Sequence, residues 1–429
     1  METTLLHQHF LECNSISTDT RKIAAGTMFF ALKGDNFDAN TFAAEALAKG
    51  AAYVVIDNPV YKTDERMLLV NNSLTALQQL AQHHRRHLGL PIIALTGSNG
   101  KTTTKELINV VLNKKYNTKA TVGNLNNHIG VPLTLLSFTN ETEIGIVEMG
   151  ANHQKEIEFL CNLAEPNFGY ITNFGKAHLE GFGGYEGVIK GKSELYAYLE
   201  ATTKTAFVNL DDDIQKEKTE QLSRFTFATE SYDGNIRIDN IEANPMVSLI
   251  YNDLHIQSHL IGIYNASNIS AAIAMGNYFK VPDTDIKEAI ENYTPTNNRS
   301  QLIEKNGIKI ILDAYNANPS SMAAALQNFV QLEDKHKIAI LGDMFELGPE
   351  SLEEHKKLVT YLADQDSVRA FFIGKDFYAN KTEASNLKFF ETFDDLKAQS
   401  AAIKLNGDEQ IILIKGSRGM ALERVLDII

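Results

Sequence analysis

The sequence predicts an α/β protein of three domains, in which a central domain with a parallel sheet and a phosphate-binding loop (P-loop) is flanked by two further α/β domains. Length is the first observation, because 429 residues suit about three domains that each bury a core. The second is the alternation of short apolar runs with helical patterns, which is typical of parallel sheets covered on both faces. The third is a glycine-rich loop with a lysine between an apolar run and a helix.

The N-terminal domain is expected over residues 1–89. Its strand-like runs lie at 27–32 and 52–56, and its helical patterns lie at 40–50 and 73–88. The last of these helices ends in the basic stretch HHRRHLG at 83–89. Such a stretch can form a metal or anion site, but we prefer to interpret it as a solvated helix end favoured by the helix dipole.

The central domain is expected over residues 90–298. Its strands are predicted at 91–95, 144–148, 168–172 and 206–208, with helical patterns between them. Residues 225–260 look like short β segments outside this alternation, and a helix follows at 264–279. The Pro- and Asn-rich stretch at 293–298 is expected to be a linker.

The loop that joins the first of these strands to its helix reads LTGSNGKTTTK over residues 95–105. Gly97 and Gly100 let the backbone approach a bulky anion, and the helix N-terminus adds partial positive charge. Lys101 can reach terminal phosphates and the Thr102 hydroxyl can ligate Mg²⁺. Leu95 stands where the full P-loop pattern has glycine, so the match is to a shorter GxxGKT form. The loop predicts a nucleotide site.

The C-terminal domain is expected over residues 299–429. Strands are predicted at 309–312, 338–341, 370–373 and 411–414, separated by helical stretches. This pattern predicts a second doubly wound, Rossmann-like α/β domain, without a phosphate loop of its own.

Composition limits the partners. Charged residues make up 22% of the chain and the net charge is −14, which argues against a nucleic-acid or anionic-membrane partner. Cys13 and Cys161 form no Cys-x-x-Cys pair, so we expect neither a disulfide framework nor a zinc site. The N-terminus lacks the features of a signal peptide, and no run approaches the ~18 apolar residues of a membrane helix. We expect a cytoplasmic monomer.

Polar residues follow two more strands of the central domain. Glu148 comes at a strand end, where a carboxylate beside a phosphate loop is expected to hold Mg²⁺. His178 lies in the glycine-rich loop after the next strand. Lys190 and Lys192 open the helix that follows, and each alone would be an ordinary solvated charge.

Together these features resemble the Mur ligases, the ATP-dependent amide-forming enzymes of peptidoglycan synthesis, over essentially the whole chain. Several stretches look like the member that joins D-alanyl-D-alanine to UDP-N-acetylmuramoyl-tripeptide through an acyl phosphate. They lie at 17–21, 29–34, 123–133, 313–319, 341–348 and 415–420. The resemblance implies ATP and Mg²⁺ as cofactors, a UDP-sugar-binding first domain, and a last domain that binds ATP and the dipeptide.

The resemblance also implies site residues. One Mg²⁺ would be held by Thr102 and Glu148, and a second by His178 and a carbamylated Lys192, with Lys190 as the competitor. The catalytic residues would be Lys101, Glu148, His178 and Lys192. ATP contacts are implied at Gly97, Ser98, Asn99, Gly100, Lys101, Thr102, Thr103, Asn268, Arg299, Asp313 and Asn316. Substrate contacts are implied at Thr20, Arg21, Lys33, Asn126, Asn127 and Arg418.

Two positions depart from the family pattern. Tyr264 stands where the family usually has histidine, and His128 stands where the D-alanyl-D-alanine ligase commonly has glutamate, which leaves the role of position 128 open. A folylpolyglutamate synthetase-like ligase and a nucleotide-binding regulatory module without ligase activity remain alternative interpretations. The third residue of the tripeptide, meso-diaminopimelate or lysine, and the general base also stay open.

Residues of one site on two domains imply closure over ATP. Lys101 belongs to the central domain, whereas Arg299, Asp313 and Asn316 belong to the last one. We therefore expect the domains to lie apart in a nucleotide-free structure, with these residues too far from Lys101 to share a ligand.

Overall fold

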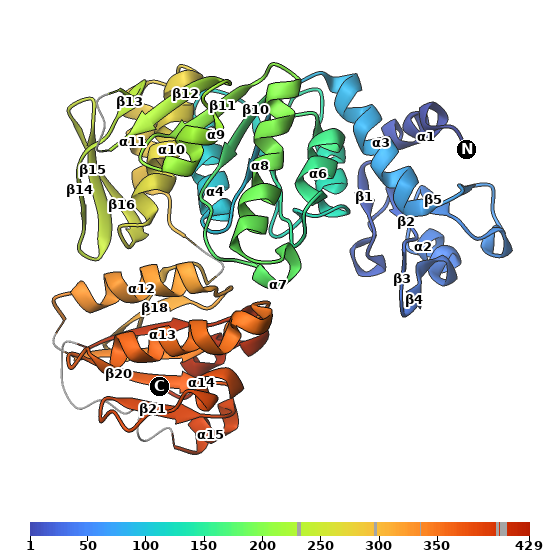
Figure 1. Cartoon of the computed structure of the whole chain (residues 1–429). Helices are drawn as coiled ribbons and strands as arrows, with labels where there is room; N and C mark the ends of the chain where they lie inside the picture. Colours follow the sequence, from blue (N-terminus) through green and yellow to red (C-terminus); the bar gives the residue numbers. More distant parts are fainter. Residues whose placement is uncertain (230–232, 296–297, 335, 400–402, 404–409) are drawn as a thin grey trace.

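The computed structural model describes residues 1–229, 233–295, 298–334, 336–399, 403 and 410–429. Three α/β bodies follow one another along the chain, and the fold class expected from the sequence is confirmed (Figure 1). The N-terminal body lies beside the central one near helix α6, and the C-terminal body lies against another side of the central body (Figure 1). Two residues of the expected linker, at 296–297, lie outside the described part of the chain.

The N-terminal body is built on a four-stranded parallel sheet of order β1-β2-β5-β6. Its central strand β2 is buried along its whole length, as its unbroken apolar run predicts. The strands are β1 (Ser15–Ser17), β2 (Thr27–Phe30), β5 (Tyr53–Ile56) and β6 (Met67–Leu69), with a small hairpin of β3 (Lys33–Gly34) and β4 (Phe37–Asp38). The helices are α1 (Thr3–Leu11), α2 (Ala43–Ala48) and α3 (Ser73–Leu88).

The end of α3 differs from the expectation. Gly89 has φ 65° and closes the helix, and Arg86 and His87 are exposed, as a solvated helix end requires. His84 and Arg85 are buried, so the expectation is wrong for them. The Arg85 guanidinium donates to the carbonyl oxygens of Ala164 and Glu165 at the end of helix α6 (Glu156–Ala164), where helical carbonyls need partners.

The central body carries a seven-stranded parallel sheet of order β13-β12-β11-β10-β7-β9-β8. Strand β7 lies in its middle, between β9 and β10, and its side chains alternate between two cores. Ile92 and Ala94 join the apolar cluster of α5, α6 and α8, whereas Ile93 and Leu95 join that of α4 and α10. Helices on both faces explain the continuous apolar run.

The strands of this sheet are β7 (Ile92–Thr96), β8 (Thr118–Ala120), β9 (Ile144–Glu148), β10 (Phe168–Ile171), β11 (Thr205–Asn209), β12 (Ser223–Ala228) and β13 (Ile236–Arg237). The other helices are α4 (Lys101–Leu112), α5 (Gly130–Leu136), α7 (Leu179–Phe182), α8 (Tyr185–Ala201), α9 (Asp213–Lys218), α10 (Asn265–Tyr278) and α11 (Asp283–Asn292). A separate antiparallel sheet accounts for most of the predicted β excursion; its strands are β14 (Asp239–Ala243), β15 (Met246–Tyr251) and β16 (Leu254–Ile261).

The C-terminal body carries a six-stranded sheet of order β17-β18-β22-β19-β20-β21, which is parallel except for the edge strand β17. Its strands are β17 (Gln301–Lys305), β18 (Ile308–Asp313), β19 (His336–Gly342), β20 (Val368–Ile373), β21 (Leu387–Phe390) and β22 (Gln410–Lys415). Its helices are α12 (Pro319–Gln331), α13 (Ser351–Ala363), α14 (Lys375–Ala379) and α15 (Phe393–Ala398).

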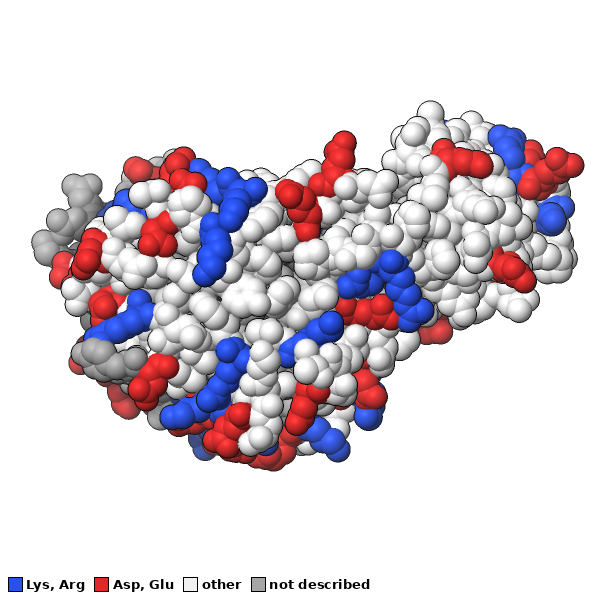
Figure 2. All heavy atoms as spheres, turned by 90° about the horizontal axis from the view of Figure 1, so that it is seen from above, with Lys and Arg blue, Asp and Glu red and all other residues white. Residues whose placement is uncertain are grey.

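The surface carries charges of both signs. On the face that Figure 2 shows, basic and acidic side chains are interspersed rather than gathered by sign. None of the helices described here combines the length and the apolar character that a membrane crossing requires.

Candidate active site

The phosphate loop joins β7 to α4 at the carboxyl edge of the central sheet. Gly97 has φ 140° and Gly100 has φ 77°, conformations that favour glycine. A Cβ at Gly97 would lie 2.0 Å from Thr172 Oγ1, and one at Gly100 would lie 2.6 Å from Asn268 Oδ1. Both the backbone conformation and the close neighbours therefore require glycine at these two positions.

Lys101 is the first residue of α4, and its side chain folds back over the loop. Its Nζ donates to the carbonyl oxygen of Gly97 at 2.7 Å and to that of Ser98 at 3.2 Å. Removal from water lowers the pKa of Lys101, Glu148 opposes this effect and Arg299 adds to it. The ammonium thus lies at the mouth of the loop, in reach of the space in front of it.

Thr102 and Glu148 meet beside the loop. The Thr102 hydroxyl donates to Glu148 Oε2 at 2.8 Å, and Asn126 Nδ2 donates to Glu148 Oε1 at 2.8 Å. Thr102 and Glu148 are buried, with 4% and 2% of their surfaces exposed. A hydroxyl and a carboxylate at this distance are oxygen donors of the kind that Mg²⁺ takes beside bound phosphates. Among the described residues, no three His, Cys, Asp or Glu side chains form a metal-binding group on their own.

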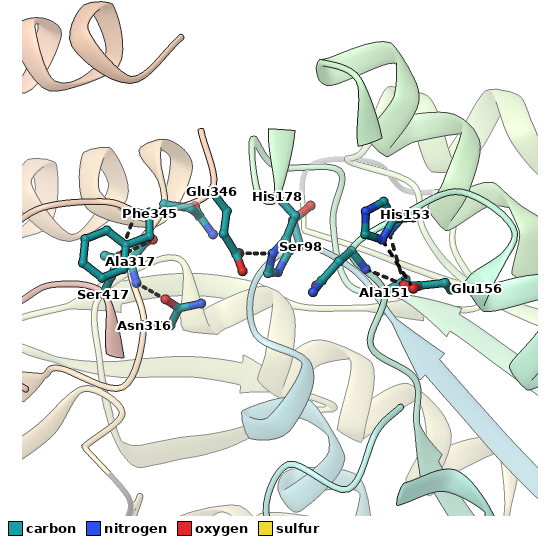
Figure 3. A network of polar contacts seen from close by, with 12 residues as sticks. Ser98, Ala151, His153, Glu156, His178, Asn316, Ala317, Phe345, Glu346 and Ser417 are labelled. Carbon is teal, nitrogen blue, oxygen red and sulfur yellow. Dashed lines mark hydrogen bonds and ion pairs between the residues drawn. The ribbon is translucent and has the colours of Figure 1, made fainter. Parts of the chain in front are cut away.

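His178 precedes helix α7 and faces the C-terminal body (Figure 3). Its Nδ1 donates to the Glu346 carboxylate, which lies between β19 and α13. This hydrogen bond holds the pKa of Glu346 below its ordinary value. In the neutral imidazole, a proton on Nδ1 leaves the lone pair on Nε2, so Nε2 keeps its capacity to bind a ligand.

Lys192 and Lys190 lie on the same helix but in different surroundings. Lys190 is exposed, whereas Lys192 is 1% exposed, lies over the Phe182 ring and donates to the Ala151 carbonyl oxygen at 3.2 Å. Burial lowers the pKa of Lys192 well below its ordinary value, and the positive charge of Lys101 lowers it further. Both effects favour the uncharged amine of Lys192.

Residues of the C-terminal body form the opposite wall. Lys415 at the end of β22 pairs with Asp313 at the end of β18 at 2.5 Å, and Asp313 also accepts from the Ser300 backbone. The Arg299 guanidinium stacks on the Tyr315 ring at 3.7 Å. Its Nε is buried without a hydrogen-bond partner, which is an arrangement that a bound anion would satisfy.

Tyr264 and Asn268 connect these walls near the start of α10. Asn268 Oδ1 accepts from Thr104 Oγ1 at 3.0 Å, below the phosphate loop. The Tyr264 hydroxyl lies 3.0 Å from Ser300 Oγ, so the tyrosine that departs from the family pattern contacts the start of the C-terminal body.

The two walls enclose one cavity of about 1180 Å³. Expected site residues that line it are Ser98, Asn99, Gly100, Lys101, Thr102, Thr103, Asn126, Asn127, Glu148, His178, Asn268, Arg299, Asp313 and Asn316. The expectation of separated domains is therefore wrong for this structure, because Arg299, Asp313 and Asn316 share a cavity with Lys101. The physical reason is a set of direct contacts between the bodies, including a 2.7 Å hydrogen bond from Asn318 to Asn99.

Other expected residues lie outside the lining of this cavity. Lys192 is buried behind Ala151, and Arg418 pairs with Glu423 at 2.8 Å. In the N-terminal body, Arg21 pairs with Asp19, and Lys33 pairs with Asp57 at 2.8 Å. Thr20 precedes Arg21 in the same short helix.

Several lining residues were not singled out from the sequence; they are Asn173, Tyr185, Asp212, Tyr315 and Asn318. Asn173 directly follows the predicted strand at 168–172, and Asn318 lies in the stretch 313–319 that carries the family resemblance, so each position offered a signal that could have found it. Tyr185 and Asp212 carry no motif that would separate them from ordinary polar residues.

A phosphate loop at the edge of a parallel sheet, with a second α/β domain as the opposite wall, defines a nucleotide-binding P-loop protein. Three family models match consecutive parts of the chain. They are described as the Mur ligase family, catalytic domain (residues 12–85), the Mur ligase middle domain (95–276) and the Mur ligase, glutamate ligase domain (298–418). The chain belongs to the Mur ligase family.

Individual relatives agree over almost the whole length. The UDP-N-acetylmuramoyl-tripeptide–D-alanyl-D-alanine ligase of Bacillus subtilis is 36% identical, over 99% of this chain and 93% of the relative. A crystal structure of MurF from Acinetobacter baumannii superposes with a TM-score of 0.88 at 31% identity, over 99% and 97% of the two chains. The MurF ligase of Thermotoga maritima, solved in complex with ADP, superposes with a TM-score of 0.84 at 26% identity, over 98% of this chain and 97% of that chain.

Proposed function

We propose that this chain is the ATP-dependent ligase that joins D-alanyl-D-alanine to UDP-N-acetylmuramoyl-tripeptide. The observation that carries the proposal is the cavity shared by the phosphate loop and the C-terminal wall, in a chain whose curated relative bears that activity in its name. A nucleotide held by one domain and an amine delivered by the other would meet in this space.

Each domain has a part in the proposal. Residues 1–89 bind the UDP-muramoyl portion through Thr20, Arg21 and Lys33. Residues 90–298 bind ATP, and residues 299–429 contribute to ATP binding and receive the dipeptide, with Arg418 as a contact. The protein acts as a cytoplasmic monomer.

The chemistry requires two anions to approach one another. The tripeptide carboxylate attacks the γ-phosphate to form an acyl phosphate and ADP, and the dipeptide amine then displaces phosphate to form the amide. Lys101 lies where it can neutralise phosphate charge, and Arg299 offers its unpaired Nε to an anion on the other wall. The site works by positioning and electrostatics fixed in advance rather than by a covalent enzyme intermediate.

Mg²⁺ fits the oxygen pair of Thr102 and Glu148, which would hold it against the phosphates. When bound there, the ion supplies positive charge to the transferring phosphoryl group. Asn126 orients Glu148 by a hydrogen bond to its other oxygen.

Lys192 supports the proposed carbamate at a second cation site with His178. Only an uncharged amine attacks CO₂, and the burial of Lys192, which lowers its pKa, favours that form. The product is an anion with oxygen ligands, which suits a hard cation. Solution NMR with isotope-labelled bicarbonate should show a carbamate signal that Lys192→Ala abolishes and Lys190→Ala retains. A signal unchanged in Lys192→Ala would contradict the assignment.

The experiment that tests the function measures ADP release and product mass together. The purified protein is given ATP and Mg²⁺ with UDP-N-acetylmuramoyl-tripeptide, in its meso-diaminopimelate or lysine form, and D-alanyl-D-alanine. A heavy-oxygen label in the tripeptide carboxylate should appear in the released phosphate, one atom per amide formed. Equal ADP release with folate and glutamate, or with nucleotide alone, would overturn the proposal.

A further inference from the structure

The segment from Thr172 to Glu180 runs from the end of β10 into the start of α7 and lies directly on the phosphate loop. Thr172 Oγ1 donates to the Asn99 carbonyl oxygen at 2.6 Å, and Ser98 Oγ donates to the Gly175 carbonyl oxygen at 2.6 Å. The Ser98 and Asn99 backbone N–H groups donate to the carbonyl and side-chain oxygens of Asn173, both at 3.1 Å. Four hydrogen bonds therefore connect the phosphate loop directly to this segment.

The opposite side of the same segment contacts the C-terminal body. The Lys176 backbone N–H donates to Ser320 Oγ at 2.8 Å, near the start of α12, and Lys176 Nζ pairs with Glu354 on α13 at 2.7 Å. Two residues on, His178 donates to Glu346. Gly175 fills the space between the two bodies, because a Cβ there would lie 2.7 Å from Asn99 Nδ2 and 3.0 Å from the Ser320 Cβ.

Glu354 receives a lysine from each of two bodies. Its side chain is 7% exposed, Lys176 reaches it from the central body, and Lys357 reaches it at 2.9 Å from one turn along α13. If the bodies separate, Lys357 stays with Glu354 and Lys176 leaves it. The Lys176–Glu354 pair therefore stabilises only the closed arrangement, in which the bodies touch. The Lys357–Glu354 pair stabilises the closed and the open arrangement equally.

We propose that residues 172–180 couple the phosphate loop to closure of the C-terminal domain, and that Lys176 and Glu354 form the interdomain latch. Lys176 acts as a positioning residue: it holds the C-terminal wall, and with it the dipeptide, against the nucleotide. This inference rests on the proposed function, because it assigns the latch to the amide-forming step of that reaction.

The two lysines of Glu354 provide a matched pair of variants. Lys176→Met and Lys357→Met each remove one positive charge from the same carboxylate, but only the first acts between the bodies. Closure is followed by energy transfer between dyes on Glu200→Cys and Thr360→Cys, two exposed positions, in a Cys13→Ser background. A slowly hydrolysed ATP analogue with Mg²⁺ is titrated, so that no ligation is needed for the signal.

Lys176→Met should raise the analogue concentration for half-closure at least about fivefold, as a coupling between two sites does. It should also raise KM for D-alanyl-D-alanine more than it lowers kcat. Lys357→Met should change the half-closure concentration, KM and kcat by less than about twofold each. Glu354→Gln should reproduce the Lys176→Met effect. The double variant that combines Lys176→Met with Glu354→Gln should need no higher analogue concentration for half-closure than either single variant.

Equal effects of the two lysine variants, or a normal closure curve for Lys176→Met, would overturn the latch. A protein that closes on nucleotide but forms no amide with any tripeptide would instead count against the proposed function. The two failures are therefore distinguishable.

Discussion

The two interfaces of the central body differ in chemistry. Towards the N-terminal body, helix α3 packs on α5 and α6, and Leu77 and Leu80 are fully buried in an apolar cluster that includes Leu135. Its buried polar groups are satisfied by carbonyl oxygens of the central body: Arg85 is 7% exposed and donates to Ala164 and Glu165, and His84 donates to Phe138. Opening this interface would expose apolar surface and leave helix-end carbonyls without partners.

Towards the C-terminal body, the contacts around the cavity are polar and partly exposed. Lys176 and His178 have 37% and 22% of their side chains exposed, and each pairs with a carboxylate on the other body. Each such pair contributes only about 1 kcal/mol, which is small enough for a ligand to shift the balance between the closed and the open arrangement. The comparison teaches that the N-terminal body is fixed to the central one, whereas the C-terminal body is held by contacts suited to opening and closing.

The largest expected effect belongs to a residue at neither interface. Lys101→Ala should lower kcat by about 10²–10³-fold, or ~3–4 kcal/mol, because the loop loses a fixed positive charge. The unfolding curve should stay unchanged, since Lys101 contacts loop carbonyls and not the core. Near-normal turnover in the folded variant, measured by ADP release, would remove the basis of the nucleotide site.

The fixed interface is tested by Leu80→Ala. Leu80 on α3 is fully buried in the apolar cluster that also contains Leu135 of the central body, so its truncation should cost about 2–5 kcal/mol of unfolding free energy. Urea unfolding followed by circular dichroism measures the loss, and Leu302→Ala, at a 38% exposed position, is the matched control. A loss no greater than that of the control would mean that this interface is not a packed core.

The mobile interface is tested by Gly175→Ala. The added methyl group would press on Asn99 and Ser320 at once, and overpacking of this kind costs about 1–3 kcal/mol. The contact with Ser320 exists only when the bodies touch, whereas Asn99 belongs to the central body and meets the methyl group with the far end of its side chain. The variant should therefore mainly shift closure towards the open form and lower the unfolding midpoint little. A lowered midpoint with normal closure would place the strain inside the central body instead.

The smallest effect is a pH dependence at the fixed interface. His7 on α1 lies 3.1 Å from His84, which donates to the Phe138 carbonyl oxygen, so His84 Nδ1 must accept from His7. Burial, with the neighbouring His84, His83 and His87, lowers the pKa of His7 from 6.5 to about 4. The neutral form is favoured by folding, so this contribution is complete above pH 6.5 and is lost as the pH falls towards 4.

The loss of stability is measured as the difference between the urea midpoints at about pH 7.5, where the His7 contribution is complete, and at about pH 5, where it is partly lost. His7→Gln keeps a donor towards His84 but does not titrate, so its midpoint should fall less over the same range. An equal fall in both proteins would assign the acid sensitivity to other groups.

Local sequence determined much of the site. Gly97, Gly100, Lys101 and Thr102 could be predicted because one strand, one turn and one helix place them. Glu148 followed from a strand end, because parallel strands end at a common edge. Lys192 was chosen over Lys190 by resemblance, and the structure adds a physical difference, since one is buried and the other exposed.

Contacts between bodies could not be predicted in the same way. Glu346 and Glu354 reach the central body only because two rigid bodies take a particular orientation, which no local pattern encodes. For the same reason, Arg85 looked like a solvated charge, although it satisfies the carbonyls of a helix about eighty residues away.

Hydrogen exchange with and without ATP, Mg²⁺ and UDP-N-acetylmuramoyl-tripeptide tests the central claim most directly, because it reports on both interfaces in one experiment. The account predicts that ligands increase protection at residues 172–180 and 318–321 and leave 77–88 and 135–138 unchanged. Equal changes at both interfaces, or a change confined to the N-terminal one, would contradict the division into a fixed and a closing interface.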